Sequence, residues 1–302
     1  MFVGSPTKLT TWVDCPARYR LTYVDRAPPG PPWAHLSFGT SVHNALRDWY
    51  LLEPDERTPA AAADLVRRDW VAVGFRDDAQ SAHWRERASA MVRDYVTTLD
   101  PHEEPAGVER SVALRTDAIG LNGRADRIDD RPSATGAREL VVVDYKTNRL
   151  PPTVDDVRSS LALAIYAAAT WRTLRRACRR VELHHLPSGR VVGWEHDDAS
   201  LRRHLRRAED IAADAARAEE TARTRRGDEG EDAEVDDLFP ARPGPACGYC
   251  DVVRSCAAGV AETQAVLRAP WDVLERWESE PGDGPGAADG AGGGATGGSP
   301  VA

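Results

Sequence analysis

Several features are scarce or absent in this 302-residue chain, and each absence narrows the class of protein. Arg, Asp or Glu interrupts every apolar run before it is long enough to cross a bilayer, which predicts a protein without a membrane-spanning helix. The N-terminus lacks a basic segment followed by an apolar one, so we expect no secretory signal, a cytoplasmic location and no membrane partner. Five cysteines in such a chain do not indicate a disulfide framework. No Gly-x-x-x-x-Gly-Lys-Ser/Thr phosphate loop occurs, so we expect no fused helicase motor.

The charge of the chain is negative overall but unevenly placed. A net charge of −9 argues against nucleic acid as a general partner, and residues 223–245 are expected to form an acidic loop. Arginines nevertheless gather in two stretches, where the candidate nucleic-acid contacts are Arg172, Arg175, Arg176, Arg179, Arg202 and Arg206. Such clusters are most often solvated helix faces, and on their own they favour that simpler interpretation.

Hydrophobic periodicity predicts an α/β protein with one folded domain over residues 1–279. Helical spacing marks a stretch opening near Gly39 and residues 5–23, 60–75, 82–99, 153–177, 197–225 and 271–277. Strand patterns mark residues 108–115, 119–128, 141–146, 181–186 and 191–195. The Gly- and Ala-rich residues 280–302 cannot bury enough apolar surface to fold, so we expect a disordered tail.

The strand that begins with Val141–Val143 ends in Asp144-Tyr145-Lys146. Side chains alternate along a strand, so Asp144 and Lys146 share one face while Val143 and Tyr145 share the other. A carboxylate and an ammonium at the end of a buried strand must be paired, hydrated or bound to a metal. Taken alone, this pattern fits an ordinary ion pair and an active site equally well.

Asp126 lies on the preceding strand, near enough to be a sheet neighbour of Asp144. Two carboxylates and a lysine form an oxygen-rich site suited to Mg²⁺ or Mn²⁺. The segment GRADRID followed by VVVDYKT resembles the PD-(D/E)XK nuclease superfamily, specifically its RecB-like branch. The resemblance implies a restriction-endonuclease-like mixed sheet flanked by helices. It also implies Asp126, Asp144 and the main-chain carbonyl of Tyr145 as metal ligands, with Lys146 beside the attacking water.

Two further motifs of that branch have counterparts in this chain. A lone histidine on an apolar helix face is more often a core residue than a ligand. Gly39 and His43, however, match the Gly-x-x-x-His motif of RecB-like nucleases, which implies His43 as a metal ligand. The Gln-x-x-x-Tyr motif is matched only by its tyrosine, Tyr166, because Ala162 stands at the glutamine position. Tyr166 is therefore a candidate catalytic residue, and the alternative is that it is an ordinary aromatic residue of the core.

The cysteines form the most specific pattern. Cys247 and Cys250 are followed by Cys256, and Cys15 stands more than two hundred residues earlier. The generic interpretation of four such thiols is a zinc site. The arrangement is similar to that of AddB-type and CRISPR-adaptation nucleases, in which one N-terminal cysteine and a C-terminal C-x₂-C-x₅-C trio hold a 4Fe–4S cluster. The resemblance favours iron–sulfur over zinc and implies a structural cluster that joins the N- and C-terminal parts of the domain.

The ordered motifs together predict a metal-dependent DNA nuclease, an exonuclease acting in repair or recombination. Without a motor of its own, it would act alone or with a separate helicase or repair subunit. The alternative is a catalytically weak or inactive nuclease-like protein that binds DNA or a repair partner, and Ala162 is the residue that motivates it.

Overall fold

The computed structural model describes residues 1–133, 136–225, 232–263 and 268–279. Its strands are β1 (Phe2–Gly4), β2 (Gly107–Arg115), β3 (Ile119–Pro132), β4 (Arg138–Lys146), β5 (Cys178–His185) and β6 (Arg190–Glu195). The helices are α1 (Pro6–Asp14), α2 (Pro16–Tyr19), α3 (Ala34–Tyr50), α4 (Pro59–Arg68), α5 (Asp78–Val96), α6 (Val154–Ser159), α7 (Leu161–Leu174), α8 (Asp198–Arg225), α9 (Asp232–Leu238), α10 (Ala257–Thr263) and α11 (Asp272–Ser279). A π-helical turn spans Arg20–Val24, and short 3₁₀ helices span Pro54–Glu56, Leu186–Ser188, Pro245–Tyr249 and Val253–Ser255. Within these ranges, no helix combines the length and the apolar character that crossing a membrane requires.

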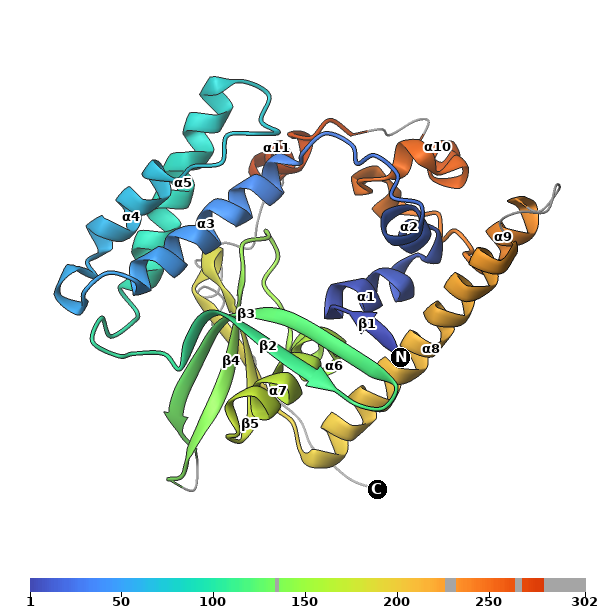
Figure 1. Cartoon of the computed structure of the whole chain (residues 1–302). Coiled ribbons are helices and arrows are strands. Elements are labelled where there is room, and N and C mark those ends of the chain that lie inside the picture. The colour runs from blue at the N-terminus through green and yellow to red at the C-terminus, as the bar shows by residue number, and fades with distance from the viewer. Residues whose placement is uncertain (134–135, 226–231, 264–267, 280–302) are drawn as a thin grey trace, which may run out of the picture.

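In the described part of the chain, six strands form one mixed sheet around the long strand β3 (Figure 1). β2 pairs antiparallel with β3 along one of its edges. The other edge of β3 is shared, because β1 pairs in parallel with its first residues and β4 pairs antiparallel with its last. β5 continues the sheet in parallel with β4, and the hairpin partner β6 completes it. The predicted mixed α/β sheet flanked by helices is therefore confirmed.

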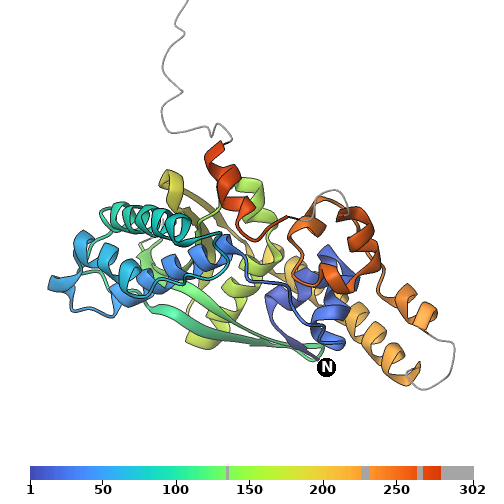
Figure 2. The same ribbon diagram turned by 90° about the horizontal axis from the view of Figure 1, so that it is seen from above.

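The two faces of the sheet pack against different helices. Val143 and Tyr145 belong to the core that contains α3, α4 and α5, whereas Leu140 and Val142 belong to the core that contains α7. This is the alternation expected of a strand buried on both faces. Figure 2 shows α3, α4 and α5 together on one side of the strands.

Several helix boundaries differ from the expectation. The first predicted helix is interrupted at Cys15, whose backbone is extended (φ −160°, ψ 105°) because the residue before a proline avoids the helical region. α3 begins at Ala34, five residues before Gly39. The predicted helix over residues 153–177 is broken at Ser160, which caps α7 by accepting a hydrogen bond from the Leu163 N–H at 3.2 Å.

The acidic stretch is a loop only in part. α8 continues to Arg225, and α9 lies within the segment that was expected to be irregular. α9 forms because Val235 and, just beyond its end, Phe239 are buried, the latter against Trp12 with ring centroids 5.8 Å apart. Residues 226–231 of the predicted loop, and the predicted tail 280–302, lie outside the described residues.

Candidate active site

β3 and β4 separate at the point where the candidate residues lie. Their pairing runs as far as Arg127 opposite Val143 and stops there. One residue further on, the Asp126 carboxylate accepts a hydrogen bond from the Tyr145 N–H at 2.8 Å, in place of a ladder bond between the two strands. This side-chain bond fixes Asp126 beside the end of β4.

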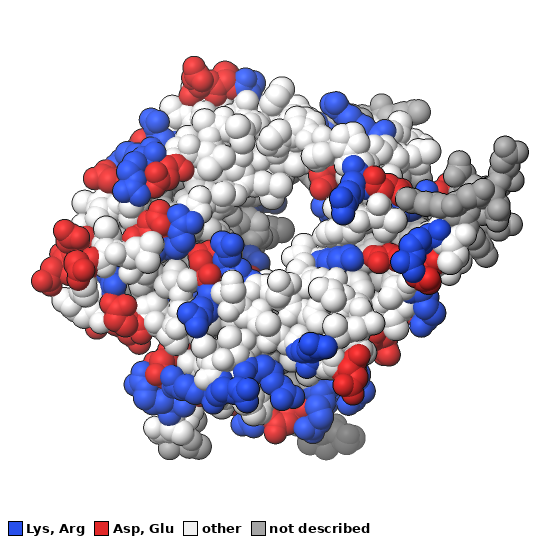
Figure 3. Space-filling model, in the orientation of Figure 1, with Lys and Arg blue, Asp and Glu red and all other residues white. Residues whose placement is uncertain are grey.

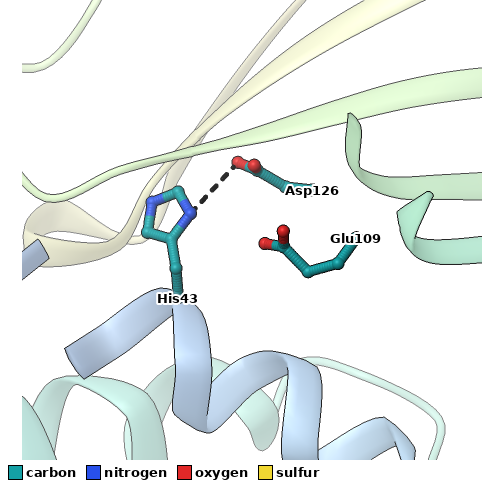
Figure 4. Close-up of side chains that lie close together, drawn as sticks. All are labelled: His43, Glu109 and Asp126. Atoms are coloured by element: carbon teal, nitrogen blue, oxygen red, sulfur yellow. Dashed lines mark ion pairs between the residues drawn. The ribbon is translucent and has the colours of Figure 1, made fainter. Parts of the chain in front are cut away.

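His43, Glu109 and Asp126 form a compact group with ligand atoms that all lie within 4.8 Å of one another. Figure 4 shows that the three side chains approach one another from α3, β2 and β3. His43 Nδ1 lies 3.5 Å from Asp126 Oδ2. Two carboxylates and an imidazole at this spacing form a ligand set suited to a divalent cation. Residues 1–133, 136–225, 232–263 and 268–279 contain no other such group of histidine, cysteine or acidic side chains.

The pKa values of the ionisable side chains in this site are shifted by burial and by the negative charges of neighbouring carboxylates. Burial by itself would lower the pKa of His43, but contact with Asp126 and the charges of Asp144 and Glu109 outweigh burial and raise it. Burial, with the neighbouring charge of Asp126, raises the pKa of Glu109. Burial likewise raises the pKa of Asp144, against the opposing effect of Lys146. Carboxylates held together at such cost are typical of sites that bind a cation.

Lys146 pairs with Asp144, with 2.5 Å between Nζ and Oδ2. The chain contains two lysines, Lys8 and Lys146, so 37 of its 39 basic residues are arginines. A lysine at this position supplies a compact ammonium, which can approach a reacting oxygen as a single point charge and can give up a proton. Because lysine is so scarce in this chain, Lys146 stands out in the sequence.

Gly39 lets α3 approach the end of β4. A β-carbon at Gly39 would lie 3.3 Å from the side-chain oxygen of Thr147, which directly follows β4. A larger residue would require Thr147 or α3 to shift by a few tenths of an ångström, and His43 lies one turn later on the same helix. The glycine and the histidine of the motif are therefore linked by packing.

Tyr166 on α7 packs directly against β3 at Gly123. A β-carbon at Gly123 would lie 2.7 Å from Cε1 of Tyr166, so this ring occupies the space above the glycine. Burial raises the pKa of Tyr166, and the charges of the Asp144 and Asp126 carboxylates raise it further. Ala162, one turn earlier on α7, has no polar side chain with which to hold Lys146, and the ionic partner of Lys146 is Asp144.

The site lies in an open cleft of about 540 Å³. Its described lining combines the candidate ligands with neutral and apolar side chains: His35, Leu36, Gly39, Thr40, His43, Asn44, Glu109, Asp126, Asp144, Tyr145, Lys146, Thr147, Asn148 and Trp277. In the space-filling view the centre of the molecule is hollowed between α3 and the α1–α2 segment (Figure 3). The cleft is therefore accessible to an extended ligand.

The sheet topology and the cation-binding character of the cleft agree with the restriction-endonuclease-like class of metal-dependent nucleases. A family model of the PD-(D/E)XK nuclease superfamily matches residues 4–257, more than four fifths of the chain, and the chain therefore belongs to that superfamily. Comparison with curated proteins gave no match. Nucleases of this superfamily work with divalent metals such as Mg²⁺ and Mn²⁺, for which the group at His43 is a candidate site.

Glu109 is the residue that the sequence analysis missed. β2 pairs with β3 so that Val108 is opposite Arg127 and Arg110 is opposite Ala125, and Glu109 lies between these pairs, beside Asp126. A shift of this register by one residue would exchange the faces of the strand, so the register decides whether Glu109 reaches the site. Glu109 also has a positive φ of 45°, a strained conformation that is frequent at functional sites.

None of the candidate nucleic-acid-binding arginines is among the residues that line this cleft. Arg176 and Arg179 flank the start of β5, where Cys178 is opposite Leu140, six residues before Lys146 on β4. Six residues of strand correspond to about 20 Å. Arg176 is paired with Asp130 at 2.6 Å and Arg179 with Asp198 at 2.7 Å. A role of these clusters in nucleic-acid binding thus stays a prediction, and it would concern a surface other than the cleft.

The four clustered cysteines meet although they are far apart in the sequence. Cys15, Cys247, Cys250 and Cys256 line one small pocket between the α1–α2 corner and the segment before α10, which Figure 2 shows side by side. Backbone N–H groups point at two of the sulfurs, from Arg18 to Cys15 at 3.5 Å and from Gly259 to Cys256 at 3.3 Å. All four are free thiols in a common pocket, whereas Cys178 is buried elsewhere, in the core beneath α7.

Proposed function

We propose that the protein hydrolyses phosphodiester bonds of DNA with a divalent metal ion, acting as an exonuclease in repair or recombination. The observation that supports this most strongly is the convergence of His43, Glu109 and Asp126 beside the Asp144–Lys146 pair in one accessible cleft. Family membership supplies the reaction class. The resemblance of the motifs to those of RecB-like nucleases is the reason for proposing DNA as the substrate and exonuclease action, in which cleavage starts from strand ends.

The residues divide into metal ligands and a group for the attacking water. His43, Glu109 and Asp126 would hold the cation, with Asp144 and the carbonyl of Tyr145 next to them. Bound Mg²⁺ or Mn²⁺ would lower the pKa of a water molecule and neutralise charge on the phosphate. Lys146, kept in place by Asp144, would orient the attacking water or stabilise the charge that develops on the phosphate oxygens. Tyr166, close to both carboxylates, would limit the movement of Asp126 on β3.

The test is cleavage of end-labelled single- and double-stranded DNA with Mg²⁺ or Mn²⁺. Lys146→Met removes the ammonium and keeps the length of the side chain, and we expect at least a hundredfold loss of rate. Lys8→Met is the matched control, because Lys8 is the only other lysine and is paired with Glu219 outside the cleft. Equal rates for wild type and Lys146→Met would overturn the proposal and favour a protein that binds DNA without cutting it. Release of mononucleotides or short products from the ends, rather than internal cuts, would identify the exonuclease.

For the cysteine pocket we propose a structural 4Fe–4S cluster. Zinc bound to four thiolates at 2.3 Å holds the sulfurs about 3.8 Å apart. No three of the described cysteines have sulfurs that all lie within 4.8 Å of one another, which is a wider spacing than that of a zinc site. The N–H groups directed at Cys15 and Cys256 fit thiolate sulfurs, which accept hydrogen bonds well. Such a cluster would close a loop of more than two hundred residues and hold the two ends of the domain together.

Anaerobically purified protein should be brown, with broad absorption near ~400 nm and about four iron atoms per chain. Cys250→Ser should lose the colour, and Cys178→Ala should keep it because Cys178 lies outside the pocket. Colourless protein with stoichiometric zinc would contradict the cluster. A separate helicase or repair subunit, which the chain would need for unwinding, is the partner to search for by co-purification.

A further inference from the structure

One wall of the active-site cleft comes from the C-terminal helix α11. Trp277 on this helix lines the cleft together with His43 and Lys146. The superfamily match ends at residue 257, whereas α11 begins at Asp272. The part of the chain that matches the superfamily therefore does not include this wall, and its role follows from the structure of this chain alone.

Packing holds α11 firmly against the helical layer. Leu274 is fully buried in the core that contains α3, α4 and α5. The Trp277 ring makes edge contacts with Phe38 and Trp84, with centroid distances of 6.2 Å and 6.0 Å, and it remains partly exposed. Figure 1 shows α11 next to the start of α3, the helix that carries His43. The Trp277 ring is thus fixed in place rather than free to move.

Ion pairs on the outer side of α11 add to this attachment. Glu278 lies 2.6 Å from His83 and 3.2 Å from Arg87, both on α5. Glu275 pairs with Arg76, which precedes α5. These bonds hold Glu275 and Glu278 against α5 and the segment before it, whereas Trp277 is the residue of α11 that lines the cleft.

The composition of the cleft shows what kind of contact it can make. Of the described residues that line the cleft, only Lys146 is a lysine or an arginine, and it is paired with Asp144. Binding that depends on a duplex backbone needs several cations, about one for each phosphate contacted. This cleft offers instead an aromatic ring, neutral polar groups and Leu36, whose side chain is 58% exposed. Apolar surface beside a phosphate-cleaving site fits contact with nucleobases rather than with the backbone.

We propose that Trp277 is a nucleobase platform. One base of the strand that binds at the metal site of His43 and Asp126 would stack on the Trp277 ring, with Leu36 at its side. This inference rests on the proposed function for the identity of the strand. Stacking on an aromatic ring accepts any base, because every base has a flat face, but that base must be unpaired. The platform therefore favours a single strand at the cleft and places the base next to the metal ligands.

Binding without cleavage tests the platform separately from the reaction. In a Lys146→Met background, Trp277→Leu keeps an apolar side chain against Phe38 and removes the stacking face. We expect Trp277→Leu to weaken binding of a fluorescein-labelled oligothymidylate, measured by anisotropy with Mg²⁺, by about 5- to 150-fold. Trp277→Phe should lose less. Trp171→Leu, which alters a partly exposed tryptophan on α7 outside the cleft, should bind like the parent.

An oligomer of abasic residues distinguishes stacking from a structural role. Trp277→Leu should bind this oligomer as the parent does, since there is no base to stack. Equal binding of oligothymidylate by Trp277→Leu and its parent, or an equal loss on the abasic oligomer, would overturn the platform.

A second measurement uses unaltered Trp277 in case Trp277→Leu does not fold. A 2-aminopurine moved along the oligomer should lose fluorescence at one position when bound, and no quenching at any position would also overturn the inference. If the wild type fails to cut DNA while these binding effects appear, the platform stands and the proposed hydrolysis fails.

Discussion

The contact between Gly123 and Tyr166 allows a quantitative prediction for Gly123→Ala. The new methyl carbon would lie 2.7 Å from Cε1, 3.1 Å from the hydroxyl oxygen and 3.2 Å from Cζ of Tyr166. Carbon atoms in contact normally lie about 3.5–4.0 Å apart, so the ring must retreat by about 1 Å. α7 cannot easily follow, because its residues on either side of Tyr166, Ile165 and Ala167, are buried. Overpacking of this kind costs about 1–3 kcal/mol.

Urea denaturation of four proteins tests this reasoning: wild type, Gly123→Ala, Tyr166→Ala and the double variant. We expect Gly123→Ala to lower the free energy of unfolding by about 1–3 kcal/mol in the presence of the ring. Once Tyr166→Ala has removed the ring, Gly123→Ala should be neutral or stabilise by a few tenths of a kcal/mol, because alanine restricts the unfolded chain. The interaction free energy between the two sites should therefore be about 1–3 kcal/mol. An equal cost of Gly123→Ala in both backgrounds would refute the steric argument.

Three further substitutions test the buried charges. Burial would raise the pKa of Glu182, but hydrogen bonds and ion pairs with one histidine and two arginines lower it to about 2. Its carboxylate therefore stabilises the fold above pH ~4.5 and loses that effect as the pH falls towards ~2. In urea denaturation, Glu182→Gln should lower the free energy of unfolding by about 3 kcal/mol at pH 7 and by little at pH 2. The same cost at both pH values would contradict this. Glu109→Gln should weaken Mn²⁺ binding in calorimetric titration at least about tenfold, and unchanged affinity would remove Glu109 from the ligand set. Arg127→Met should lower the free energy of unfolding by about 3–5 kcal/mol. It removes the guanidinium that pairs with the buried Asp129 and that donates a hydrogen bond to the Tyr145 hydroxyl. A cost below about 1 kcal/mol would show that Arg131, which also pairs with Asp129, compensates.

The sequence by itself determined the local parts of the site. Asp144 and Lys146 share a face because side chains alternate along any strand, and this shared face allows their pairing at 2.5 Å. The helix that carries His43 and the hairpin of β5 and β6 were predictable for the same reason, since apolar periodicity and turn residues act over a few positions. The order of the motifs was enough to indicate the superfamily, which the family match bears out.

Tertiary structure alone decided which distant residues join them. Glu109 reaches the site because β2 pairs with β3 in one register rather than the next, and the energy that selects the register comes from packing on both faces of the sheet. Tyr145 is held by Arg127, a buried cation whose partners come from β3, α3, α5 and β4. Trp277 enters the cleft because Leu274 is buried in the core of α3, α4 and α5, helices that lie about two hundred residues earlier in the chain. Such contacts depend on the sum of many weak interactions over the whole fold, so no short segment of the sequence specifies them.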